Sequence, residues 1–139
     1  MKVFSLLLLV AFFMVGCESN DPRPKTYRAT ITTVNNKVCV LAPVESGEYL
    51  NGLEFNEAGS EQKRFRKYFS IADKEPVLLS SDKCVPDYGY KFEAGHDYGI
   101  LVETFSKEKV EKKRTPVGRN YIASFSLSEK DGRLSVTSN

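Results

Sequence analysis

Three cysteines and a single histidine are the most reactive side chains in this sequence. Cys17 ends an apolar run near the start of the chain, whereas Cys39 and Cys84 are isolated within the part that follows. Two cysteines in a small domain outside the reducing cytosol most often form a disulfide. We therefore expect a bond between Cys39 and Cys84, with two buried free thiols as the alternative.

The histidine, His96, gives little support for catalysis. General acid–base and nucleophilic sites most often use histidine, but His96 falls in a turn between Gly95 and Tyr98, where we expect it to be exposed to solvent. The sequence has no Cys-x-x-Cys pair and no Gly-rich phosphate loop. It therefore predicts a protein that is not an enzyme, with no catalytic residue, metal site or cofactor. A hydrolase that uses scattered carboxylates is the alternative.

The first sixteen residues have the pattern of an export signal. Lys2 precedes an apolar run from Val3 to Gly16, which is shorter than the roughly 20 residues of a membrane-spanning helix. Its length fits the apolar region of a secretory signal peptide. We expect residues 1–16 to be a signal peptide that is removed, residues 17–25 to be a polar tether, and residues 26–139 to form one domain.

The end of this signal resembles the lipobox of bacterial lipoproteins, in the residues Met14-Val15-Gly16-Cys17. In that family the cysteine thiol receives a diacylglyceryl group, the signal is cut before it, and the new amino terminus is acylated. The resemblance implies lipidation at Cys17. Because Glu18 follows rather than Asp, it also implies anchoring in the outer membrane, facing the periplasm. An ordinary signal peptide that is cut near a cysteine is the alternative.

The charge balance argues against one class of partner. The formal net charge is +2 at pH 7, and loss of Lys2 with the signal lowers it by one unit. A nearly neutral domain has no electrostatic basis for binding nucleic acid. An exported protein would also be separated from the nucleic acids of the cytoplasm.

A basic and aromatic stretch near the middle of the chain is a candidate protein contact. On a strand, Phe65 and Phe69 would share one face. Arg64, Arg66 and Tyr68 would share the other. Arg and Tyr are enriched in binding hot spots, so we expect these three residues to contact an acidic protein partner. The alternative is an outer strand whose solvated charges prevent unwanted pairing of its edge.

Tyr88 is a second candidate contact residue. It follows Cys84 in a loop, residues 82–89, that the disulfide would brace. A rigid aromatic knob loses little entropy when a partner docks on it. Packing of Tyr88 into the core is the alternative.

Short β-type runs separated by turn signals fill the domain. Asn35-Asn36 predicts a tight hairpin, Gly52 predicts a bulge or a close backbone approach, and Lys130-Asp131-Gly132 predicts another hairpin turn. No run shows a sustained helical period, and we expect the charged residues 107–114 to form a solvated loop, with partner or lipid contact as the alternative. The runs lie at residues 27–33, 37–41, 49–55, 62–69, 77–79, 88–92, 98–105, 121–127 and 134–136.

This pattern predicts an all-β fold, an antiparallel β-sandwich of about seven to nine strands. Phe92, Gly95 and Tyr98 resemble the tyrosine corner of immunoglobulin-like and fibronectin type III domains. In those domains the Tyr hydroxyl bonds back to the backbone before the turn. The resemblance implies an immunoglobulin-like or fibronectin III-like sandwich, and a barrel is the alternative.

Several stretches together resemble a group of small enterobacterial lipoproteins described as type VI secretion immunity proteins of the periplasm. The resemblance implies a protein that neutralises a toxin delivered into the periplasm, and it brings no established functional residues. The stretches are Val38-Cys39-Val40, Gly47-Glu48-Tyr49, Lys83 to Phe92, Gly95, Tyr98 and Ala123 to Leu127.

The sequence as a whole favours a protein that acts by stoichiometric binding. An anchored small domain without catalytic residues fits an immunity protein that binds a toxin. A structural or envelope-assembly lipoprotein, which binds lipid, glycan or another envelope component, is the alternative. The sequence does not indicate an oligomeric state.

Overall fold

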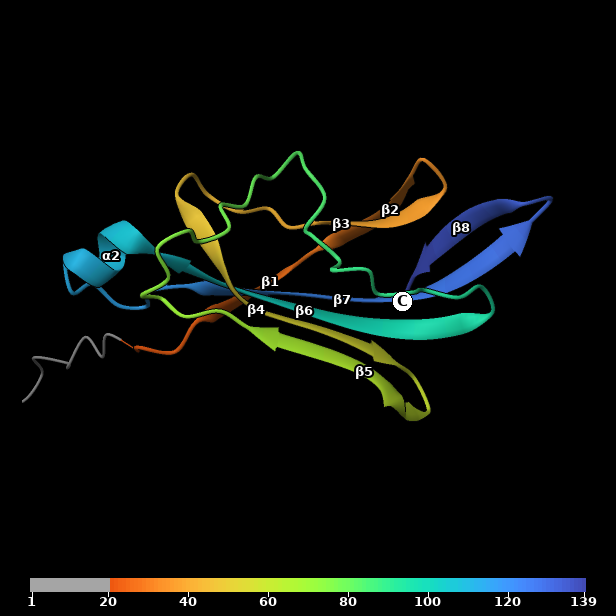
Figure 1. Ribbon diagram of the computed structural model, residues 1–139, viewed down its shortest axis with the longest axis horizontal. Helices are drawn as coiled ribbons and strands as arrows, with labels where there is room; N and C mark the ends of the chain where they lie inside the picture. Colours follow the sequence, from red (N-terminus) through yellow and green to blue (C-terminus); the bar gives the residue numbers. More distant parts are fainter. Residues whose placement is uncertain (1–20) are drawn as a thin grey trace, which may run out of the picture.

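The computed structural model describes residues 21–139, which form eight strands and one short helix (Figure 1). The predicted signal peptide and Cys17 lie outside the described residues. The elements are β1 (Lys25–Arg28), β2 (Thr30–Val34), β3 (Lys37–Leu41), β4 (Glu48–Glu57), β5 (Ser60–Tyr68), β6 (His96–Ser106), α2 (Lys107–Glu111), β7 (Arg119–Lys130) and β8 (Arg133–Ser138).

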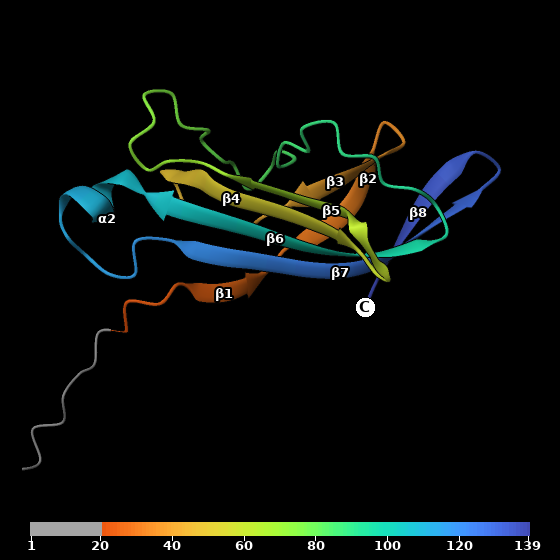
Figure 2. The ribbon, with the colours of Figure 1, turned by 60° about the horizontal axis from the view of Figure 1, so that its bottom comes forward.

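The strands form two sheets of unequal size. The large sheet has the order β1-β7-β6-β4-β5, with β8 paired to β7, and the small sheet is the hairpin of β2 and β3. The hairpin and the long loop between β5 and β6 lie on the same side of the large sheet (Figures 1 and 2). The core between them contains the fully buried Leu50, Phe55, Val102, Tyr121 and Phe125.

The prediction of an all-β, sandwich-like fold is confirmed. The two layers differ from the nearly equal sheets of an immunoglobulin domain, because the small layer has only two strands. The loop between β5 and β6 completes that layer, and it contributes Leu79 and Val85 to the core.

The predicted first strand, residues 27–33, is divided between the two sheets. β1 pairs with β7 in parallel, and the Ala29 N–H then donates to the Ile122 carbonyl at 2.8 Å. Beyond Ala29 the chain enters β2, which pairs antiparallel with β3. The prediction of a wholly antiparallel sandwich is therefore wrong at this edge of the large sheet. The alternation of side chains does not reveal that the run is divided between two sheets. Ala29 and Ile31, on either side of Thr30, both face the same core, so the pattern continues without a break.

Local turn signals are confirmed where the chain reverses direction. Asn35 and Asn36 both have positive φ, 52° and 58°, in the turn between β2 and β3, and Asp131 and Gly132 do the same between β7 and β8. The pairing of β4 with β6 shifts register between Leu50 and Gly52, the predicted bulge.

Two predicted runs are not strands. Residues 77–79 form only an isolated bridge, between Tyr49 and Leu78. Residues 88–92 begin in a turn, in which the Tyr90 N–H donates to the Asp87 carbonyl at 3.0 Å. Apolar residues recur in both segments because they pack on the large sheet as a covering loop.

The charged run after β6 begins with a helix instead of the predicted loop. Ser106 caps α2, and its hydroxyl accepts a hydrogen bond from the Lys109 N–H at 3.3 Å. A five-residue helix is too short to produce a recognisable period in the sequence. Within residues 21–139, no helix has the length and apolar character needed to cross a membrane.

The tyrosine corner is present at the start of β6. The Tyr98 hydroxyl accepts a hydrogen bond from the Glu93 N–H at 2.7 Å, five residues upstream. The same hydroxyl donates to Glu57 Oε1 at 3.1 Å. Burial, together with the hydrogen bond to Glu57, raises the pKa of Tyr98 to about 12. The hydroxyl therefore stays protonated and ties the turn to the large sheet.

Strand β4 carries three buried glutamates, Glu48, Glu54 and Glu57. Glu48 accepts hydrogen bonds from the Thr104 hydroxyl at 2.6 Å and from the Tyr121 hydroxyl at 2.9 Å. Burial and the bond to Glu48 raise the pKa of Tyr121 above its usual value. Because a buried charge is costly unless it is paired, each of these carboxylates fixes its partners in place.

The disulfide between Cys39 and Cys84 is confirmed. It joins β3 to the loop between β5 and β6, with the two Cα atoms 5.1 Å apart. Next to it the Val85 N–H donates to the Val40 carbonyl at 2.8 Å. The bond therefore holds the covering loop against the small sheet.

We expect replacement of both cysteines, Cys39→Ser with Cys84→Ser, to lower the free energy of unfolding. The bond closes a sequence separation of 45 residues, for which the chain-entropy model gives about 4 kcal/mol. Urea unfolding, followed by circular dichroism, measures the change. Reducing agent serves as the control, because it should destabilise the wild type and leave the double variant unaffected. Equal unfolding midpoints for the two proteins would contradict the prediction.

Candidate partner-binding surface

Strand β5 lies at the edge of the large sheet and presents two different faces. Phe65 and Phe69 pack against the core. By alternation, Arg64, Arg66 and Tyr68 lie on the opposite face of the sheet. The hairpin and the covering loop lie on the core side (Figure 2), so these three residues belong to the open face.

The open face has an apolar centre between basic edges. The strand registers define one row of neighbouring residues across the sheet, from β5 to β1. Its members, in order, are Arg66, Glu54, Leu101, Ile122 and Arg28. Ile122 is 46% exposed, and Tyr68, next to Arg66 in the sequence, is 64% exposed. Exposed aromatic, aliphatic and Arg side chains on one face are the composition of a protein-binding surface.

Glu54 holds the two arginines of this face. Arg64 donates from Nε and Nη2 to Glu54 Oε1 at 3.0 and 2.7 Å, and Arg66 Nε donates to Oε2 at 2.8 Å. The Arg66 guanidinium carbon also lies 5.9 Å from the ring centre of Tyr68. The arginines are thus ordered before any partner arrives. The sequence did not identify Glu54, because its role follows from the pairing of β4 with β5.

The environment of Glu54 favours its charged form. Burial opposes ionisation, but hydrogen bonds from Asn56, Arg64 and Arg66 together outweigh it and lower the pKa of the Glu54 carboxyl. Two guanidinium groups share this single buried carboxylate, and Arg64 Nη1 also lies 3.8 Å from Oε2 of the exposed Glu61.

Tyr88 lies apart from Arg64, Arg66 and Tyr68, on the core side of β5. Its ring centre is 5.6 Å from that of Phe69, and Lys67 Nζ is 4.4 Å from the ring centre of Tyr88. The four candidate contact residues therefore occupy two surfaces that meet at the edge strand.

The backbone at Tyr88 is unusual for an exposed aromatic residue. Tyr88 has φ 52° and is 40% exposed, and Gly89 after it has φ 78°. Positive φ costs a non-glycine residue roughly 1–2 kcal/mol. The turn is held by the Asp87 side chain, which accepts from the Gly89 N–H at 2.9 Å, and by the nearby disulfide. The turn thus fixes the backbone at Tyr88, whose ring is partly exposed and partly packed on Phe69 and Lys67.

A second polar cluster, which was not predicted from the sequence, lies at the other end of β5. His96 is half-buried as the first residue of β6, in place of the predicted exposed turn. Its Nδ1 lies 3.2 Å from Glu57 Oε1, and its Nε2 lies 3.8 Å from Glu93 Oε2. Lys63 Nζ lies 3.5 and 3.2 Å from the same two glutamates.

The chemistry of this cluster is that of an ion-paired brace. The ligand atoms of Glu57, Glu93 and His96 lie within 4.8 Å of one another, a spacing that a divalent cation could bridge. The Lys63 ammonium already contacts both carboxylates, so a metal ion would have to displace it. The cluster joins the turn before β6 to β4 and β5.

Comparison with known proteins gives one match. A family model described as a domain of unknown function (DUF7480) matches residues 26–130. No curated protein and no solved structure matches the chain.

We expect Glu54→Gln to lower stability at neutral pH by roughly 1–2 kcal/mol, since it removes charge-assisted hydrogen bonds. The depressed pKa of Glu54 stabilises the folded protein above the unfolded-state value of 4.5, and this contribution is lost as the pH falls through the folded-state pKa. The two proteins should therefore become equally stable in acid. Thermal unfolding from pH 7 to pH 2 measures the difference.

The matched control is Glu61→Gln, because the Glu61 side chain is 93% exposed and an ion pair so exposed, here 3.8 Å from Arg64, contributes little to stability. This variant should follow the wild type at every pH. A stability difference for Glu54→Gln that persists unchanged in acid would contradict the assignment.

Proposed function

The chain belongs to this family of unknown function, and we propose that it is a non-catalytic binding protein of the bacterial cell envelope. Its role is that of an immunity-type lipoprotein, which neutralises a toxin by stoichiometric binding. The toxin would be an effector delivered by a type VI secretion system, as the sequence resemblance implies. The activity needs a preformed contact surface and no reacting group.

The observation that carries this proposal is the Tyr88 turn. The positive φ of Tyr88 costs folding free energy, and the residue stays 40% exposed although its ring contacts Phe69 and Lys67. Such strain persists where the surrounding structure enforces it, and here the Asp87 side chain and the disulfide do so. A knob that is rigid beforehand loses little entropy on binding, which favours the tight capture that neutralisation requires.

The open face supplies a second contact area on the other side of β5. Tyr68 and Ile122 provide exposed apolar surface, and the ordered Arg66 lies between Tyr68 and Glu54. A toxin that binds both faces of the edge strand β5 would contact Tyr88 on the core side and Tyr68 on the open face.

The proposed anchor determines where capture takes place. β1 begins at Lys25, so seven residues, 18–24, separate it from Cys17. An extended segment of that length spans less than about 30 Å. With Cys17 lipidated, the domain would bind its toxin close to the periplasmic surface of the outer membrane.

Co-expression tests the biological role. Cells that produce the toxin encoded beside this gene, directed to the periplasm, should survive when the full-length protein is present and die without it. Unchanged killing in the presence of the protein would overturn the immunity role. Envelope defects after deletion of the gene, in cells that contain no toxin, would favour the envelope-assembly alternative instead.

We expect Tyr88→Asn to weaken capture of the toxin about 10-fold or more, because an aromatic anchor at an interface contributes above 1 kcal/mol. Asn tolerates positive φ, so the turn should be retained. The variant also loses the contacts of the Tyr88 ring with Phe69 and Lys67, so thermal unfolding is measured beside binding to show that the domain is folded at the assay temperature. Surface plasmon resonance with the immobilised full chain measures the affinity.

Leu78→Ala is the matched control for this variant, since Leu78 is an exposed apolar residue, 59% exposed, outside both contact areas. It should bind the toxin as tightly as the wild type does. Full affinity in Tyr88→Asn would remove Tyr88 from the contact surface.

A further inference from the structure

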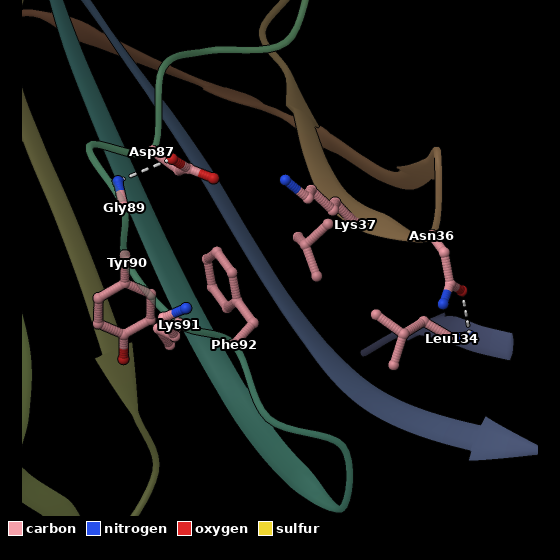
Figure 3. Close-up of a pocket in the computed structure, with 9 residues that line it drawn as sticks. Asn36, Lys37, Asp87, Gly89, Tyr90, Lys91, Phe92 and Leu134 are labelled. Atoms are coloured by element: carbon pink, nitrogen blue, oxygen red, sulfur yellow. Dashed lines mark hydrogen bonds between the residues drawn. The ribbon is translucent and has the colours of Figure 1, made fainter. Parts of the chain in front are cut away.

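A pocket of about 270 Å³ lies beside the Tyr88 turn (Figure 3). Three segments that are distant in the sequence enclose it: the tip of the β2–β3 hairpin, the loop after the disulfide, and the start of β8. Its lining residues are Asn36, Lys37, Val38, Asp87, Gly89, Tyr90, Lys91, Phe92 and Leu134.

Hydrogen bonds hold the walls of this pocket in place. The Asn36 amide donates to the Gly132 carbonyl at 2.9 Å and accepts from the Leu134 N–H at 2.8 Å, which ties the hairpin tip to β8. On the other side the Tyr90 hydroxyl donates to the Lys63 carbonyl at 2.8 Å. The pocket is therefore preformed, as ligand sites usually are.

The floor and the rim of the pocket differ in chemistry. Val38, Phe92 and Leu134 are half-buried and pack against the core, so the floor is apolar. Lys37 and Lys91 stand at the exposed rim (Figure 3). Within residues 21–139, neither lysine has a carboxylate oxygen within the 4.0 Å of a salt bridge.

The one carboxylate in the pocket is already engaged. Asp87 Oδ1 accepts a hydrogen bond from the Gly89 N–H at 2.9 Å, and this bond holds the Tyr88 turn. The rim thus carries two ammonium groups against one carboxylate. Its charge is complementary to an acidic ligand.

We propose that this pocket binds an extended acidic segment of the protein partner. One carboxylate would lie between Lys37 and Lys91, and a neighbouring apolar side chain would cover Phe92. The volume is below the roughly 300–1,000 Å³ of sites that enclose a small molecule, and it suits a single anchoring side chain. The proposal rests on the proposed binding function, because the pocket extends the surface that Tyr88 begins.

The test uses two short peptides as probes, so it does not need the toxin. The full isotope-labelled chain is titrated with acetyl-Glu-Leu-Glu-amide and with acetyl-Lys-Leu-Lys-amide while its backbone amide NMR signals are recorded. The acidic peptide should shift the signals of Lys37, Gly89 and Lys91 in a saturable way. The basic peptide should leave them in place. Equal shifts with both peptides, or no saturation with the acidic one, would overturn the proposal.

Charge removal on the rim gives the matched variants. Lys37→Gln with Lys91→Gln should weaken binding of the acidic peptide about five-fold or more, since it removes two charge-assisted contacts. Lys83→Gln changes an exposed lysine of the same loop that does not line the pocket, and it should bind as the wild type does. Unchanged affinity in the double variant contradicts the proposal.

The two proposals can fail separately. If the acidic peptide binds at this pocket and no toxin is neutralised, the pocket assignment stands and the immunity role falls. If the toxin is captured as tightly by the double variant as by the wild type, the immunity role stands and the pocket assignment falls.

Discussion

Three buried carboxylates on one strand determine how the large sheet is put together. A buried charge is costly unless it is paired, and β4 places Glu48, Glu54 and Glu57 where less than a tenth of each residue is exposed. Glu54 takes its partners from β5, Glu48 from β6 and β7, and Glu57 from β5 and β6. A slip of β4 by one residue would separate all three from their partners. Polar contacts, as well as apolar packing, therefore specify the register of four strands.

Features that depend on a few neighbouring residues could be predicted from the sequence. The Asn35-Asn36 turn, the bulge at Gly52 and the tyrosine corner at Tyr98 each follow from local backbone preferences or a short motif. The division of the first strand at Ala29 could not be predicted. It depends on which sheet offers a free edge, and β7 offers one to β1. The helix α2 was missed because its five residues rely on a cap.

In the candidate site, too, the sequence predicts what depends on neighbouring residues and not what depends on the packing of distant segments. Alternation was enough to place Arg66 and Tyr68 on one face, because β5 pairs regularly with β4 from Phe65 to Tyr68. Arg64 lies beside a register shift, and its hydrogen bonds to Glu54 place it on the same face. It could not place Tyr88 on the other side of the strand, since a loop decides that position. The partners of Glu54 depend on strand register, which a single sequence does not reveal. The contact surface is consequently larger than the stretch that first suggested it.

The parallel pairing of β1 with β7 has a mechanical consequence. Tension on the segment before Lys25 runs along β1, parallel to β7 and across the hydrogen bonds that join the two strands. The bonds are loaded in shear and share the force, whereas strands pulled apart from one end break their bonds one after another. The Ala29 N–H, bonded to Ile122, adds a further link before the chain turns into the small sheet. Force applied at this end of the domain therefore meets all the bonds of the first strand together.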